Sequence, residues 1–140
     1  MNAKLKRLLT IIGAILIIIF IAIVITSVVS KKSREEKKLY DKLDTIVKEY
    51  YKDYYYPVVM GSSESLRLYN AKNLSETGIK VTLRQIANSK GNDADSVLSQ
   101  FKNYKTKNDC DYDNTKITIY PQDPFGNEDM KYESTIVCGF

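Results

Sequence analysis

The stretch TKITIYPQDPFGNEDMKYESTIVC, residues 115–138, predicts the architecture of the C-terminal part of the chain. Its two ends, TKITIY and KYESTIVC, are rich in β-branched and aromatic residues that alternate with polar ones, as half-buried strands do. The residues between them, PQDPFGNEDM, have the composition of turns. We therefore expect an antiparallel β-hairpin with a long loop. Because two strands alone are only marginally stable, the hairpin must pack on a helix or pair with a further strand.

The chain has two cysteines, Cys110 and Cys138, and they flank this hairpin. Either they are free thiols in a reducing cytosol or they form a bridge outside it. Antiparallel pairing brings the start of the first strand close to the end of the second, which favours a disulfide. If the cysteines face each other directly, Ile117 pairs with Lys131. A bridge across this 28-residue separation would indicate an extracytoplasmic compartment.

Between residue 57 and the hairpin, the sequence predicts short helices and turns. Residues 79–83 fit a short strand equally well. Several residues are typical of helix caps or stops. They are Ser63 before a helix at residues 64–71, Gly78 after it, Thr82 with Gln85 around residues 83–88, and Asp93 before a helix that carries Val97, Leu98 and Phe101.

Before residue 57 the sequence predicts one nearly continuous helix, from about Lys4 to about Tyr56. Pro57 is the expected stop, because proline lacks an amide donor and restricts the residue before it. The second half of this helix is amphipathic. Its apolar stripe consists of Leu39, Leu43, Ile46 and Tyr50, flanked by Val47 and Tyr54. The stripe spans only about two heptads, so we expect it to pack on the C-terminal domain rather than form an independent coiled coil.

The first half of the predicted helix contains the run LLTIIGAILIIIFIAIVITSVV, residues 8–29, which are 22 uncharged residues. As a helix the run reaches about 33 Å, enough to cross the hydrocarbon core of a bilayer. A cleaved signal peptide is one alternative, but its apolar region is about 7 to 15 residues long. A buried soluble helix is another, but little in this run is polar enough to face water. We expect a retained transmembrane helix whose basic flanks contact lipid head groups: Lys4, Lys6 and Arg7 before it, Lys31 and Lys32 after it.

Two signals disagree about orientation. The basic residues after residue 30 outnumber those before the span, which favours a cytoplasmic C-terminal domain. The cysteine pair favours the opposite orientation. We expect a single-pass protein of the cell membrane with a cytoplasmic N-terminus and an extracytoplasmic C-terminal domain. The predicted fold class is α+β, divided into a basic tail (1–7), a transmembrane helix (8–29), its amphipathic continuation (30–56) and the C-terminal domain (57–140).

The sequence points away from enzymatic function. It contains no histidine, which removes the usual general base and all histidine metal ligands, and it has no nucleophile elbow or phosphate-binding glycine loop. Asp109, Asp111 and Asp113 alternate as at the start of a calcium loop, but an EF-hand would have glycine at Asn114. They are weak calcium candidates, with solvated turn carboxylates as the alternative. We expect no enzyme activity and no cofactor.

Two further features bear on partners. The net charge of +4 reflects basic residues beside the membrane span, so we expect lipid contacts and no nucleic-acid binding. The segment EYYKDYYYP, residues 49–57, holds five of the eleven tyrosines. They either stack on a ligand or form the junction between the helix and the C-terminal domain.

The order of the elements resembles that of type IV pilins and of the pseudopilins of type II secretion. The predicted loop is also similar to the Asp-Pro-aromatic-Gly-Asn turn of major pseudopilins, here Asp123, Pro124, Phe125, Gly126 and Asn127. The sequence lacks the glycine-phenylalanine peptidase site of prepilins and has no glutamate in the span. The resemblance implies a displayed, non-enzymatic domain that binds other membrane or envelope proteins or further copies of itself. The alternative is a small accessory subunit of a transport or secretion complex that acts mainly through its helix.

Overall fold

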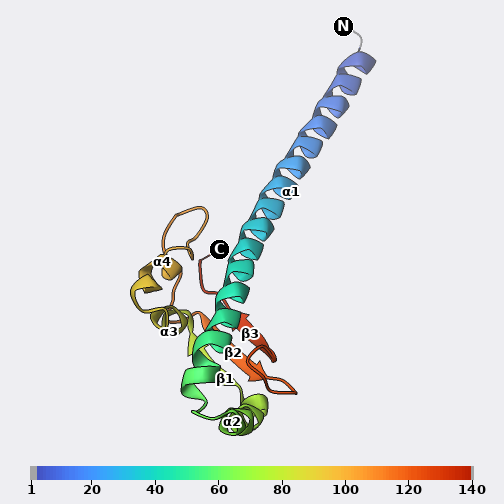
Figure 1. The fold of residues 1–140 in the computed structure, drawn as a ribbon. Helices are drawn as coiled ribbons and strands as arrows, with labels where there is room; N and C mark the ends of the chain where they lie inside the picture. Colours follow the sequence, from blue (N-terminus) through green and yellow to red (C-terminus); the bar gives the residue numbers. More distant parts are fainter. Residues whose placement is uncertain (1–2, 140) are drawn as a thin grey trace. The chain divides into compact units, whose positions relative to one another are not determined.

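The computed structural model describes residues 3–139 and divides into two compact units, Met1–Lys38 and Leu39–Phe140. We call the second unit the head. Helix α1 (Ala3–Glu49) begins in the first unit and ends in the head. The other elements all belong to the head (Figure 1): η1 (Tyr50–Val59), α2 (Glu64–Thr77), β1 (Ile79–Thr82), α3 (Leu83–Asn88), η2 (Gly91–Asp93), α4 (Ala94–Leu98), β2 (Lys116–Pro121) and β3 (Met130–Thr135). The predicted α+β class is confirmed.

The three strands form one antiparallel sheet in the order β1-β2-β3. The central strand pairs on both sides, since Ile119 lies opposite Ile79 of β1 and Tyr132 of β3. Ile117 and Ile119 are buried and the residues between and beside them are more exposed, so one face of β2 contributes to the core. The predicted hairpin is confirmed, and β1 is the further strand that it requires.

The predicted hairpin register is wrong. Ile117 pairs with Ser134, not with Lys131, which is a difference of three residues. A turn before β2 accounts for this difference, because Thr115 N–H donates to Asp111 O at 2.9 Å. The turn takes up chain length on one side of the hairpin only, so the two cysteines meet beyond the ladder.

The predicted end of the long helix is also wrong. Helix α1 is followed directly by the π-helix η1, which contains Pro57 and ends at Val59. In a π-helix each carbonyl accepts from the amide five residues later, as Tyr55 O does from Met60 N–H at 3.0 Å. In this spacing Pro57 withholds one donor near the end of the element without stopping it.

The amphipathic stripe packs on the rest of the head, as predicted. Leu39, Leu43 and Tyr50 are buried, and Ile46 is half-buried. Val47 is also fully buried, so the core-facing side is wider than the predicted stripe. A polar contact joins the same stretch of α1 to the sheet, since the Tyr132 hydroxyl donates to Asp44 Oδ1 at 3.2 Å.

Most of the predicted caps are confirmed. Ser63 Oγ accepts a backbone amide of α2, Gly78 ends that helix, and Thr82 with Gln85 forms a capping box at α3. Asp93 is the exception, because its side chain makes no cap hydrogen bond to α4. The short helix η2 ends at Asp93 and leads directly into α4, so α4 begins from chain that is already helical.

Candidate interaction surfaces

The first unit presents an apolar helix surface. Among the described residues, one helix is long and apolar enough to cross a membrane, and its most apolar window has no buried residues. Large side chains such as Ile18 and Phe20 are about two-thirds exposed. The predicted flanks Lys6, Arg7, Lys31 and Lys32 are exposed, whereas the side chain of Lys4 lies outside the described part of the chain. The structure thus agrees with membrane anchoring by this helix.

The head is closed by a disulfide between Cys110 and Cys138, both of which are buried. The residues around Cys138 are fixed by further contacts. The buried Asn103 Nδ2 donates to Cys138 O at 2.8 Å and to Gly139 O at 3.0 Å. Val137 N–H donates to Thr115 Oγ1 at 3.0 Å. The C-terminal segment is therefore held both covalently and by buried polar groups.

Sequence reasoning overlooked Asn103. Its Oδ1 accepts the amides of Lys105 and Thr106 at 2.9 and 3.1 Å, so one side chain joins a loop to the C-terminal segment. Asparagine in a polar stretch is typical of a solvated loop, and only the long-range contacts distinguish this one. Substituting it would remove a partner from the carbonyl of the buried Cys138 and from three partly buried backbone groups.

The three calcium candidates do not converge on one point. Each has its own partner, namely Lys102 for Asp109, Asn114 for Asp111 and Arg84 for Asp113. The hydrogen bonds from Asn114 hold the pKa of Asp111 below its usual value. Residues 3–139 contain no group of three or more His, Cys, Asp or Glu side chains placed to hold a metal ion. The arrangement instead stabilises the turn before β2.

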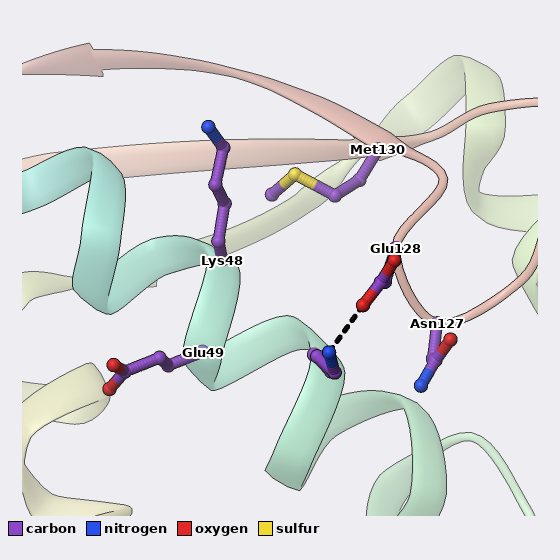
Figure 2. Close-up of a pocket in the computed structure, with 6 residues that line it drawn as sticks. Lys48, Glu49, Asn127, Glu128 and Met130 are labelled. Carbon is purple, nitrogen blue, oxygen red and sulfur yellow. Dashed lines mark hydrogen bonds and ion pairs between the residues drawn. The ribbon is translucent and has the colours of Figure 1, made fainter.

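A pocket of about 300 Å³ lies between the helix and the loop that joins β2 to β3. Figure 2 shows Glu128 extending from the loop toward the helix. Glu128 forms an ion pair with Lys52. This contact lowers the pKa of Glu128 and raises that of Lys52. In the same view Met130 extends toward Lys48, and Glu49 points away from the loop. Of the other two charged lining residues, Lys48 pairs with Asp44 and Glu49 pairs with Lys90. The lining of this loop pocket offers no nucleophile activated by a base.

The predicted pilin-like turn lies in this loop. Asn127 lines the loop pocket, and Phe125 packs against the core with a positive φ of 65°. The side chain of Asp129 fixes the turn, since its Oδ2 accepts Gly126 N–H at 2.8 Å. Asp123 and Pro124 are exposed and joined by a cis peptide bond. The turn therefore faces the helix on one side and solvent on the other.

The tyrosine segment is mostly part of the junction. Tyr50, Tyr51 and Tyr56 are buried, while Tyr54 is 38% exposed. Burial raises the pKa of Tyr50 to about 12. The hydroxyl of Tyr51 is buried without a hydrogen-bond partner in the described structure. Tyr54 is the most exposed of the five tyrosines, and Tyr55 is half-buried.

No protein-family model matches the chain, and no curated protein or solved structure is significantly similar to it.

Proposed function

We propose that this chain is a single-pass membrane protein that displays its head outside the cytoplasm, where it makes non-enzymatic contacts with envelope components, other membrane proteins or further copies of itself. The proposal rests on the presence of two features, an apolar helix and a disulfide-closed head, in the same chain. A helix suited to lipid is continuous in sequence with a head that has its own core and is closed by a disulfide. Each part would be out of place in a reducing aqueous compartment.

The disulfide supports the orientation. Cys110 and Cys138 are 4% and 7% exposed, so neither is placed as a reactive or metal-binding thiol. A pair that is bonded and buried serves stability, and such bonds persist outside the cytosol. The basic residues after the span oppose this orientation, and Lys6 and Arg7 at the other end support it. We give the disulfide more weight because it is buried and closes the C-terminal segment of the head.

The resemblance to pilins supports the same arrangement. A membrane-spanning half-helix, an amphipathic half that packs on the head, and a C-terminal antiparallel sheet follow one another in the order expected for a pilin-like subunit. The absent peptidase site argues for a retained N-terminus. The lining of the loop pocket, which has no nucleophile beside an activating base, supports a non-enzymatic role.

Topology can be tested by thiol labelling of the full chain in cells, because the bridge leaves no free native thiol. The two probe variants are Ser62→Cys, at an exposed head position, and Lys6→Cys, at an exposed position before the span. We expect a membrane-impermeant maleimide to label Ser62→Cys in intact cells and Lys6→Cys only after permeabilisation. The unmodified chain should be labelled only after reduction.

The opposite pattern would overturn the proposal. If Ser62→Cys reacts only after lysis and the unmodified chain reacts without reductant, the head is cytoplasmic and its cysteines are free. If the mature protein lacks the Lys6→Cys thiol altogether, the apolar run is a cleaved signal peptide.

A further inference from the structure

A second pocket in the head, about 330 Å³ in volume, is formed by η1, β1 and α3. We call it the tyrosine–amide pocket. Its volume lies at the lower end of the range for small-molecule sites. Its lining consists of Tyr50, Tyr54, Val81, Gln85, Asn88 and Ser89.

The lining of this pocket carries no charged residue, in a chain of which 27% is charged. By contrast, four of the six residues that line the loop pocket are charged. Charged residues do flank lining residues in the sequence, and two of the flanking pairs are neutralised: Glu49 pairs with Lys90 at 2.7 Å and Arg84 pairs with Asp113 at 2.6 Å. Asp53 and Lys80 also flank the lining without being part of it. The lining itself therefore supplies no counter-charge for a charged ligand, which favours a neutral one.

One wall of the pocket is aromatic. The ring centroids of Tyr50 and Tyr54 lie 5.6 Å apart. Tyr50 is 5% exposed and Tyr54 is 38% exposed. The core thus fixes Tyr50, and Tyr54 extends the wall toward solvent. A tyrosine hydroxyl is protonated at neutral pH, and burial raises the pKa of Tyr50 further, to about 12, so the hydroxyl can donate a hydrogen bond.

The facing wall offers hydrogen-bonding groups in defined states. Gln85 Oε1 accepts Thr82 N–H at 2.9 Å, which orients its carboxamide and leaves the NH₂ group to donate. Ser89 Oγ donates to Ile86 O at 2.6 Å, so its lone pairs remain to accept. The exposed Asn88 side chain makes no hydrogen bond within residues 3–139 and so offers both donors and acceptors.

We propose that the tyrosine–amide pocket binds a neutral carbohydrate. A pyranose ring has apolar C–H faces that pack on an aromatic ring and equatorial hydroxyls that match carboxamides and hydroxyls. A purely apolar ligand would leave the amide groups without partners. This inference deepens the proposed function by naming a ligand class for the head. It rests on the proposed function only for the location of the head outside the cytoplasm, where the head would encounter the sugar.

The test uses the full-length protein in micelles of a detergent that contains no sugar, because glycoside detergents would compete for the site. Saturation-transfer difference NMR with chitotriose and maltotriose reports direct contact between protein and sugar protons. We expect saturation transfer to at least one probe. Tyr54→Ala should weaken binding about tenfold, while Tyr54→Phe, which keeps the ring, should stay within about twofold of the parent.

Tyr69→Ala is the matched control, because Tyr69 is 64% exposed on α2 and lies outside the pocket. It should bind like the parent. Asn88→Ala tests the amide wall independently and should also weaken binding, so the test does not depend on one variant folding. A preference for chitotriose would assign acetamido sugars, and equal binding of both probes would assign neutral glycans in general.

Absence of saturation transfer to either probe would overturn the inference, as would equal losses in Tyr54→Ala and Tyr69→Ala. These results are separable from a failure of the proposed function. Sugar binding in micelles does not depend on orientation, and thiol labelling does not depend on the pocket.

Discussion

Removal of the Cys110–Cys138 bridge tests how the head is stabilised. The bridge spans a sequence separation of 28 residues. The loop-closure entropy that such a bond removes from the unfolded chain corresponds to about 3 to 4 kcal/mol at 25 °C. Small domains are stable by about 5 to 15 kcal/mol in total, so the double variant Cys110→Ala/Cys138→Ala should lose a large fraction of its stability.

The assay is urea unfolding of the full-length protein in micelles, followed by the near-ultraviolet circular dichroism of its tyrosines. With a denaturant slope of about 1 to 3 kcal/mol/M, the midpoint should fall by about 1 to 4 M. Both cysteines are buried, so alanine also removes packing atoms. Parent protein held in reductant is the matched control, because it keeps both side chains and lacks only the bond.

The comparison of these two samples decides the outcome. If the reduced parent is destabilised by nearly as much as the double variant, the bond itself is the main contribution. If the reduced parent loses less than about 1 kcal/mol after mass spectrometry has shown the bridge in the untreated protein, the entropic reasoning is refuted.

Three further predictions concern the core, a turn and the tyrosines. Leu43→Ala, at a fully buried site of α1, should cost about 2 to 5 kcal/mol in the same unfolding assay, whereas Val58→Ala, at a 65% exposed site, should change stability by less than about 0.5 kcal/mol. Gly78 and Gly91 both have a positive φ, of +73° and +61°. A Cβ added at Gly78 would lie 2.5 Å from the side chain of Thr118 in β2, whereas a Cβ added at Gly91 would meet open space. Gly91→Ala should therefore cost about 1 to 2 kcal/mol and Gly78→Ala more, with equal losses contradicting the steric argument. Because the pKa of Tyr50 is about 12 in the folded head and about 10 when unfolded, its contribution is fully present below pH 10 and is lost as pH rises toward 12. Unfolding midpoints measured across this range should fall as pH rises, and a flat profile would contradict the burial of the tyrosines.

Local signals in the sequence predicted the elements well. The capping box of Thr82 and Gln85 and the stop at Gly78 involve residues only a few positions apart, so local chemistry determines them. The hairpin strands follow from alternation. The strand at residues 79–82 was undecided, because four residues carry too little periodicity to separate a strand from a turn.

Long-range relations were harder to predict. The disulfide could be predicted because the chain has only two cysteines and they flank the hairpin. The positions of the cysteines did not determine the register between β2 and β3. The turn at Asp111 uses chain length that a direct ladder would not. Pro57 lies inside a π-helix, a rare element that general propensities do not predict. The tyrosine–amide pocket joins residues from η1, β1 and α3, and nothing in the tyrosine run alone indicates the amide wall.

The position of β2 at the centre of the sheet has a consequence for biosynthesis. Both β1 and β3 pair only with β2, which begins at Lys116 of a 140-residue chain. During translation the whole of α1, with its apolar half and its core-facing stripe, is therefore synthesised long before any strand has a partner. The sheet can be complete only after β3, which ends at Thr135, has been synthesised, and the local hairpin of β2 and β3 is the pairing with the shortest loop to close. Until then the core-facing residues of α1, such as Leu43 and Val47, lack the packing partners that bury them in the folded head, and such exposed apolar surface favours aggregation.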